Sequence, residues 1–343
     1  MDLLHSWGVE LAVHLQIKYQ DYESVFHWVS SLADLHTTFF VFFPVWFHLR
    51  RDVAVKLIWV AVVGDWLNLV LKWVLFGERP YWWVHETKFY GSMKHPELQQ
   101  FSMTCETGPA VSLYKICYSV HQHLCNQARI AVLIFHVEMD LLSAYLNVSD
   151  QGLVQLMLWM FLGLVELLVC MSRVYLAAHF PHQVICGVIS GIIVAETFSR
   201  VQWIYSASLK KYFSITLFLL SFAVGFYVLL KALGVDLLWT LEKAQKWCIN
   251  PAWVLMDATP FASLLRNMGT LFGLGLGLHL SHYDPGSSKK HTCICFRIGC
   301  IGVSLVLLQL LDKMTFSSSS QLFYLLSFCK SAVALLLPTA LVP

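Results

Sequence analysis

Residues 212–233 read YFSITLFLLSFAVGFYVLLKAL, an almost unbroken apolar run with a single basic residue near its end. A helix that crosses the hydrocarbon core of a bilayer needs about 20 consecutive, mainly apolar residues. This run meets that requirement, and comparable runs recur along the chain. The sequence therefore predicts a membrane protein with several spanning helices.

The composition of the whole chain agrees with a membrane protein and argues against two other classes. Of its 343 residues, 57% are hydrophobic and only 13% are charged, and the mean hydropathy is +0.63. An ordinary soluble domain has about a quarter charged residues. The net charge is +2, and the basic residues are scattered instead of forming a stripe, which argues against nucleic-acid binding.

Hydropathy and length predict an all-α, polytopic membrane helical bundle of about nine spanning helices, formed as a single domain over residues 1–343. The expected spans follow the apolar runs at residues 26–48, 54–75, 128–146, 153–171, 182–199, 212–233, 261–280, 293–311 and 322–343. Residues 1–22 mix apolar and charged positions, so we expect an amphipathic surface helix there and no cleaved signal peptide.

Basic residues indicate which loops face the cytosol, because cytoplasmic loops carry an excess of Lys and Arg. The basic residues that flank the first, fifth and seventh loops are Arg50, Arg51, Lys56, Arg200, Lys210, Lys211, Lys289, Lys290 and Arg297. The even loops 76–127, 172–181 and 234–260 then share the opposite side with the N-terminus. The sequon Asn147-Val-Ser149 falls on the cytosolic side, so we expect it to be unused.

The cysteines indicate neither a metal site nor a dense disulfide framework. Cys293-x-Cys295 has no second pair at zinc spacing. We expect most cysteines to be small apolar side chains within helices. The ten cysteines stand at positions 105, 117, 125, 170, 186, 248, 293, 295, 300 and 329.

Two polar clusters break the apolar pattern on the same expected side of the membrane. The first is Lys72-Trp-Val-Leu-Phe-Gly-Glu-Arg79-Pro80, at the exit of the second span. On a helix this spacing is nearly two turns, so Lys72 and Arg79 would project from about the same face. Lys supplies a point charge and Arg a bidentate fork to phosphate oxygens. The alternative is that both side chains extend to the membrane interface.

The second cluster, Ser172-Arg173-Val-Tyr-Leu-Ala-Ala-His179-Phe-Pro181-His-Gln183, lies between the fourth and fifth expected spans. Pro181 suits the first turn of a helix, which places His179 at a helix N-terminus that favours anions. Ser172 and Arg173 can bind phosphate oxygens, and imidazole can act as a covalent nucleophile. The alternative is an interfacial loop with a hydrogen-bonded histidine, but two such clusters on one side favour a phosphate site.

Both clusters resemble motifs of the type 2 phosphatidic acid phosphatase and haloperoxidase superfamily. Lys72-x6-Arg79-Pro80 resembles its first motif, and Ser172-Arg173-x5-His179 resembles its third. Longer runs are similar to the glucose-6-phosphatase catalytic subunit family in particular, at residues 59–69, 79–83, 104–109, 172–183 and 236–245. The resemblance covers residues 1–109 and about 153–343, and Gln183 stands where the wider superfamily usually has Asp.

The resemblance implies a nine-span enzyme of the endoplasmic reticulum membrane, with a catalytic core over about residues 54–200 that faces the lumen. It would hydrolyse glucose 6-phosphate to glucose and phosphate, the last step of gluconeogenesis and glycogenolysis, without a metal or other cofactor. By motif position, His179 would form a phosphohistidine. Lys72, Arg79, Ser172 and Arg173 would hold the phosphoryl oxygens and stabilise transition-state charge. The family also implies a glucose 6-phosphate transporter as a partner, beside membrane lipid.

The chain departs from this family over residues 110–150. The family's second motif, Pro-Ser-Gly-His, supplies the general acid that protonates the leaving sugar oxygen, and a gapless comparison places Lys115 at the position of its histidine. A lysine is a poor acid unless burial lowers its pKa greatly. Three interpretations stay open: an incorrect or alternatively spliced translation of this block, a protein that has lost turnover, or His121 or His123 in the acid role.

Two other functions stand beside the sugar phosphatase. One is a lipid phosphate phosphatase of the same superfamily. The other is a non-catalytic homologue or splice product that keeps the phosphate cradle. The missing second motif favours the non-catalytic product, whereas retention of His179 with Lys72, Arg79 and Arg173 disfavours it.

Three further groups of residues suit packing as well as function. Asp65 and Asn68 in the second span are expected to hydrogen-bond neighbouring helices or to line a sugar pocket. Trp82 and Trp83 suit the interfacial aromatic belt about as well as a platform for a sugar ring. Gly269-x3-Gly273 predicts close packing of one membrane helix on another and not a nucleotide-binding loop.

Overall fold

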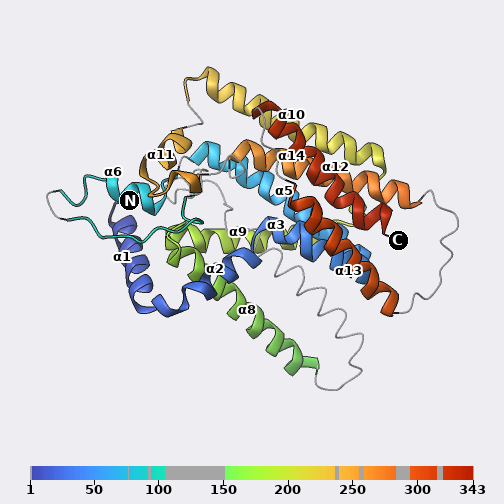
Figure 1. Ribbon diagram of the computed structural model, residues 1–343, viewed down its shortest axis with the longest axis horizontal. Coiled ribbons are helices and arrows are strands. Elements are labelled where there is room, and N and C mark those ends of the chain that lie inside the picture. The colour runs from blue at the N-terminus through green and yellow to red at the C-terminus, as the bar shows by residue number, and fades with distance from the viewer. Residues whose placement is uncertain are drawn as a thin grey trace. The chain divides into compact units, whose positions relative to one another are not determined.

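The computed structural model describes residues 2–75, 77–91, 94–105, 151–235, 239–254, 259–282, 294–314 and 320–342 (Figure 1). Every regular element in these ranges is helical, which confirms the expected all-α class. The chain divides into two compact units. Unit 1 comprises residues 1–34, 67–195 and 227–260, and unit 2 comprises residues 35–66, 196–226 and 261–343.

Unit 1 contains every candidate site residue whose side chain is described. Its elements are α1 (Asp2–Lys18), η1 (Gln20–Tyr22), α2 (Glu23–Leu32), the last turns of α5 (Arg51–Leu75), α6 (Pro80–Glu86), α8 (Gln151–Tyr175), most of α9 (Pro181–Ser199), α11 (Trp239–Trp247) and η5 (Pro251–Trp253). In this unit α1 packs against α6 and α8, α2 packs against α8, and α11 packs against α6. Two helices of this unit begin with a proline, α6 at Pro80 and α9 at Pro181.

Unit 2 combines long, mainly apolar helices with short helical segments. Its elements are α3 (Leu35–Thr37), η2 (Thr38–Phe42), α4 (Phe43–Leu49), most of α5, η4 (Trp203–Ser206), most of α10 (Leu209–Ala232), α12 (Pro260–His282), α13 (Ile294–Asp312), α14 (Ser320–Leu336) and η7 (Leu337–Leu341). A Cβ on Gly269 would collide with the carbonyl oxygen of Phe328, and one on Gly273 with that of Ala332. The predicted close packing at Gly269-x3-Gly273 is therefore confirmed, with α14 as the partner helix.

Asp65 has the packing role that the sequence suggested. Its Oδ2 accepts hydrogen bonds from Ser263 Oγ at 2.8 Å and from Asn267 Nδ2 at 2.6 Å, so it joins α5 to α12 within unit 2. A buried carboxylate held by two donors is satisfied by protein groups. The structure thus assigns Asp65 to helix packing and not to a sugar pocket.

The expected count of nine spans is not confirmed. Among the described residues, five helices are long and apolar enough to cross a membrane, at 51–70, 181–198, 209–232, 294–312 and 322–341. The broken pair 20–32 and 35–49 adds a sixth if it counts as one span. The fourth and seventh expected spans correspond to α8 and α12, and neither helix is among the five. Helix α12 contains the polar residues Arg266 and Asn267. The third, 128–146, lies outside the described residues.

The N-terminal segment forms the expected helix, but its buried face packs on protein. That face consists of His5, Ser6, Gly8, Val9, Ala12 and Gln16, so half of its residues are not apolar side chains suited to lipid. Gln16 Nε2 donates to the carbonyl oxygens of Gln99 at 3.0 Å and of Tyr175 at 2.7 Å, and Gln16 Oε1 accepts from the amide of Gln99 at 3.0 Å. These bonds fix α1 to the end of α8.

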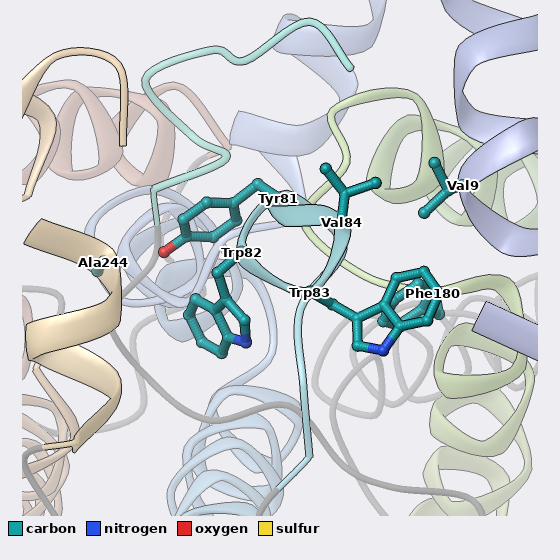
Figure 2. Packing of buried hydrophobic residues seen from close by; sticks show 7 residues of the cluster. All are labelled: Val9, Tyr81, Trp82, Trp83, Val84, Phe180 and Ala244. Carbon is teal, nitrogen blue, oxygen red and sulfur yellow. The ribbon is translucent and has the colours of Figure 1, made fainter. Parts of the chain in front are cut away.

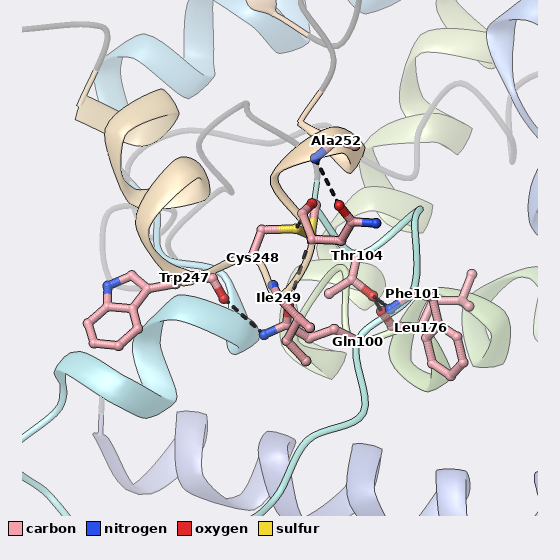
Figure 3. The surroundings of a disulfide bond; sticks show 10 residues. Gln100, Phe101, Thr104, Leu176, Trp247, Cys248, Ile249 and Ala252 are labelled. Atoms are coloured by element: carbon pink, nitrogen blue, oxygen red, sulfur yellow. Dashed lines mark hydrogen bonds between the residues drawn. A yellow bond between two sulfur atoms is a disulfide. The ribbon is translucent and has the colours of Figure 1, made fainter.

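Cys105 and Cys248 form a disulfide bond, which the sequence analysis does not predict (Figure 3). Gln100 joins the same two segments beside it, because its Nε2 donates to Trp247 O at 3.1 Å and its Oε1 accepts from Ile249 N at 3.0 Å. The other described cysteines, which form no disulfide bond, all lie within helices, as expected, at positions 170, 186, 295, 300 and 329. Cys117, Cys125 and Cys293 lie outside the described residues.

Candidate active site

The connection between α8 and α9 brings the residues of the second cluster together. After α8 ends at Tyr175, Ala177 adopts a positive φ of 51°, which is unusual for a residue with a Cβ. The amide of Ala178 donates to Arg173 O at 3.2 Å and that of Ala177 to Val174 O at 3.0 Å. This pair of bonds is the Schellman pattern that ends a helix and reverses the chain. Ser172 and Arg173 at the end of α8 therefore lie near His179 in the connection.

His179 lies two residues before the first residue of α9 and is 4% exposed. The start of α9 is capped by Gln183, whose Oε1 accepts from the amide of Phe180 at 3.0 Å. Gln183 Nε2 donates to Glu78 O at 3.0 Å, so the same side chain holds the connection against the segment before α6. The placement of His179 at a helix start agrees with the expectation from Pro181.

Arg79 reaches the same connection from the N-cap position of α6. Its side chain is 0% exposed, and Nη1 donates to the carbonyl oxygen of Ala178 at 3.0 Å. The expectation that Lys72 and Arg79 share a helix face is wrong, because α5 ends at Leu75 and Arg79 has extended backbone angles. Arg79 therefore lies outside α5, and it contacts the residue before His179 from the N-cap position of α6.

The other expected site residues are described to different extents. Ser172 is fully buried, and its Oγ donates to Val169 O at 2.7 Å within its own helix. Arg173 is buried beside it at the end of α8. The backbone of Lys72 belongs to α5, but its side chain lies outside the described part of the structure. Lys115, His121 and His123, the three candidates for the acid position, also lie outside it.

Trp82 and Trp83 belong to an aromatic core under the site, not to a membrane-interface belt (Figure 2). Both indoles are buried, and the cluster also contains Val9, Tyr81, Val84, Phe180 and Ala244. Figure 2 shows Trp83 against Phe180, and their ring centroids are 5.9 Å apart. Because Phe180 follows His179 directly, this core supports the connection that carries the expected nucleophile.

An ion-pair network lies on the α11 side of α6. Lys243 Nζ is 2.7 Å from Glu86 Oε2 and 3.3 Å from Glu78 Oε2. Trp82 Nε1 donates to Glu78, and Trp247 Nε1 donates to Glu86 Oε1 at 2.7 Å. Burial by itself raises the pKa of Glu86, but the hydrogen bonds from Lys243 and Trp247 outweigh it and leave that pKa below its usual value. Glu86 is therefore a carboxylate at neutral pH.

A pocket of about 350 Å³ opens beside this network. It is lined by Asp2, Glu78, Trp83, Glu86, Thr87 and Lys88. A larger pocket of about 780 Å³ lies in unit 2 around Arg51, Asp52 and Tyr205, and none of the expected phosphate ligands with a described side chain lines either pocket. We take the smaller pocket as the one connected with the candidate site, because Trp83 also belongs to the core that supports His179.

Sequence reasoning missed several residues that hold this site. Thr104 Oγ1 donates to Leu176 O at 2.6 Å and accepts from the amide of Phe101 at 2.9 Å, which ties the segment before Cys105 to the connection. His5 and His182 are buried and stack on Phe180. His182 lies within the quoted second cluster, but no spacing rule could place His5 of α1 beside it.

Comparison with known proteins agrees with the geometry. Residues 53–207, which include all five expected catalytic and phosphate-binding positions, match the PAP2 superfamily. A glucose-6-phosphatase catalytic subunit 1 from Haplochromis nubilus is 61% identical over an alignment that covers 100% of this chain and 96% of the relative. The chain belongs to the glucose-6-phosphatase catalytic subunit family.

Other members of the glucose-6-phosphatase family match over the full chain as well. The catalytic subunit 1 of Canis lupus familiaris is 51% identical and that of Mus musculus is 49% identical, each over 100% of this chain and 95% of the relative. Glucose-6-phosphatase 2 of Mus musculus is 42% identical over 100% of this chain and 96% of the relative. No solved structure matches the chain.

Proposed function

We propose that this protein hydrolyses glucose 6-phosphate to glucose and phosphate through a phosphohistidine at His179. The observation that carries the proposal is the buried bond from Arg79 to Ala178 O, which joins the two phosphatase motifs at the residue next to His179. An imidazole nitrogen attacks phosphorus, and the bond from phosphorus to the sugar oxygen breaks. Water then attacks the phosphohistidine, the phosphorus–nitrogen bond breaks, and phosphate leaves.

The phosphate group would be held by Lys72, Arg79, Ser172 and Arg173. Arg79 and Arg173 are both buried, and a buried guanidinium strongly favours an anion that offers it several oxygens. The Ser172 hydroxyl, which now bonds within its own helix, would have to rotate toward the ligand. A preorganised cationic cradle of this kind stabilises the charge that spreads over the phosphoryl oxygens in the transition state.

The sugar would occupy the pocket beside Trp83. Its volume of about 350 Å³ is in the range of small-molecule sites. Carboxylates such as Glu78 and Glu86 are acceptors for sugar hydroxyls, and both keep part of their surface exposed while Lys243 holds them from the other side. A hexose monophosphate therefore suits the pair of subsites better than inorganic phosphate alone does.

The expected location and pathway belong to the same proposal. We place the enzyme in the endoplasmic reticulum membrane with its site toward the lumen, where it acts in gluconeogenesis and glycogenolysis beside a glucose 6-phosphate transporter. The basic residues that flank the odd-numbered loops support this orientation. The phosphatase domain is proposed to extend over residues 1–343.

A non-catalytic product is the second candidate, and the sequence at residue 115 favours it. A lysine stands where the family's second motif has its acid histidine. General acid catalysis contributes about 10²–10⁴-fold to such a reaction. A chain that lacks this acid could bind phosphate and still turn over very slowly.

Phosphate release from glucose 6-phosphate by microsomes that express the chain distinguishes these candidates. We expect release that His179→Ala abolishes and that Lys115→His increases. Arg200→Lys, at an exposed helix end, is the matched control and should leave release unchanged. If only Lys115→His is active, the unsubstituted chain has an intact phosphate cradle but lacks the proton donor. If every stably expressed variant is silent, the chain is a non-catalytic product.

A further inference from the structure

Three rings from two segments far apart in the sequence form a stack next to His179. The ring of His5, on α1, lies 4.2 Å from that of Phe180 with an interplanar angle of 13°. It lies 5.4 Å from the ring of His182 at 21°, and His182 lies 5.5 Å from Phe180 at 15°. Trp83 closes the group edge-on, 5.0 Å from His5. The two imidazoles are thus held against the residue that follows the expected nucleophile.

Both imidazoles are buried, and neither has a hydrogen-bond partner among the described residues. His5 is 6% exposed and His182 is 5% exposed, and neither ring nitrogen of either residue has a partner within the described ranges. Buried polar groups are nearly always hydrogen-bonded in folded proteins, so each exception calls for an explanation. Four unpaired ring nitrogens at one place indicate a site that is completed by a ligand, by water or by transferred protons.

The position of His5 is fixed by close packing of α1 on the connection. A Cβ on Gly8 would lie 2.9 Å from Phe180 Cδ1 and 2.9 Å from Pro181 Cδ, so only a glycine allows this approach. Gln16 fixes the other end of α1 through its bonds to Gln99 and Tyr175. Because α1 is held at both points, the fold itself fixes the position of His5 beside His182.

Few charged groups among the described residues act on this pair. On α1, Asp2 and the amino terminus face His5; on α9, the neighbour is His182; and on α6 the contact is Trp83, which does not titrate. Arg79, Arg173 and His179 belong to the adjacent cradle. Burial lowers the pKa of His5 to about 4, against a smaller opposing effect from Asp2. A bound phosphate dianion would favour the protonated imidazole instead.

We propose that His5 and His182 form a proton-holding pair that takes up a proton from solvent when a phosphate group binds in the cradle. This inference rests on the proposed function. The pair donates this proton to the leaving sugar oxygen. Lys115 is poorly suited to this role. Once neutral, the pair accepts the proton that is released when water attacks the phosphohistidine, and it returns this proton to solvent after phosphate has left.

The test is calorimetric titration of the full chain in lipid nanodiscs with inorganic phosphate, near pH 7, in buffers of different ionisation enthalpy. The dependence of the observed heat on the buffer gives the number of protons taken up. We expect the unsubstituted chain to take up roughly half a proton more than the double variant His5→Gln, His182→Gln. His85→Gln is the matched control, because His85 is also stacked on an aromatic ring, Trp247, at 4.8 Å and 9°.

Each outcome decides the matter. Phosphate binding with proton uptake that is lost in the double variant and kept in His85→Gln supports the pair. Binding with unchanged uptake in the double variant overturns the pair and leaves the proposed function intact. If the unsubstituted chain does not bind phosphate, both proposals fail. Should the double variant lose its thermal unfolding transition, His5→Gln alone must show a partial loss of uptake, and an unchanged uptake there overturns the inference.

Discussion

Arg79 is a completely buried guanidinium whose Nη1 donates to a backbone carbonyl, and a charge in such a place is costly unless other groups compensate it. We expect Arg79→Lys to weaken inorganic phosphate binding about 10- to 100-fold, because lysine loses the bidentate fork and the bond to Ala178. Titration calorimetry measures the change. The exposed pair of Arg200 with Glu196 provides the control, since Arg200→Lys should leave phosphate affinity unaltered. Equal phosphate affinities of Arg79→Lys and Arg200→Lys would show that Arg79 does not bind the phosphate group.

His5 makes the stability of the chain depend on pH. Burial lowers its folded-state pKa from 6.5 to about 4, so the imidazole is neutral in both the folded and the unfolded state above pH 6.5. As the pH falls from 6.5 toward 4, only the unfolded state binds the proton, and the free energy of unfolding falls by at most about 1.4 kcal/mol per pH unit. Thermal unfolding should show a shallower loss in His5→Gln over that window. Parallel pH curves for the two chains would contradict the assignment.

At the scale of single residues, sequence and structure agree where the cause is local. Pro80 and Pro181 both begin helices because their fixed φ suits a first turn, but only the helix start at Pro181 was predicted. The hydrogen bond from Arg79 to Ala178 joins residues 99 positions apart, and no local sequence pattern predicts it. The stacking of His5 on His182 has the same cause, since it depends on tertiary packing of α1.

The element α1 is the clearest test of packing, because its approach to the α8–α9 connection leaves no room at Gly8. We expect Gly8→Ala to displace α1, lower the free energy of unfolding by about 1–3 kcal/mol and reduce phosphate release. Gly163→Ala is the matched control, since nothing lies within 4 Å of a Cβ there. That substitution should be neutral or slightly stabilising, because alanine favours a helix interior by about 1 kcal/mol. Thermal unfolding of both variants in detergent measures the difference.

The segment that ends at Cys105 is joined to the end of α11 by a disulfide over a sequence separation of 143 residues. A cross-link between distant residues restricts the unfolded chain, and such bonds typically contribute about 2–4 kcal/mol. We expect Cys105→Ser to lower the melting temperature, and a reductant to lower that of the unsubstituted chain by a similar amount. The variant itself should then be insensitive to reductant. A reductant effect of equal size in both chains would show that the stabilisation comes from elsewhere.

At the scale of elements, apolar length and glycine spacing predicted more than polar segments did. The run at 212–233 is confirmed as α10, and Gly269-x3-Gly273 packs on α14 as expected. Residues 76–105 were predicted only as a loop, yet they contain α6 and a segment held by Gln16, Thr104 and Cys105. Hydropathy does not detect such order, because it arises from hydrogen bonds and a disulfide to partners elsewhere in the chain.

Across the whole molecule, the disulfide and the loop charges lead to the same orientation. Cys105 lies in the second loop and Cys248 in the sixth, which the basic residues of the odd loops assign to the side away from the cytosol. Disulfides persist in oxidising compartments such as the lumen of the endoplasmic reticulum and are rare in the cytosol. Redox chemistry and loop charge are thus two independent arguments for the lumenal position proposed above.

The orientation can be tested by labelling single introduced cysteines with a membrane-impermeant maleimide in sealed microsomes. Lys94→Cys replaces a side chain that is 80% exposed in the second loop, and Lys210→Cys replaces an exposed one at the fifth. We expect Lys210→Cys to add one label per chain in intact microsomes. Lys94→Cys should add one only after permeabilisation, because the membrane separates its loop from the reagent. The unsubstituted chain gives the background from its free cysteines. Labelling of Lys94→Cys in intact microsomes would place the second loop, and with it Arg79, on the cytosolic side.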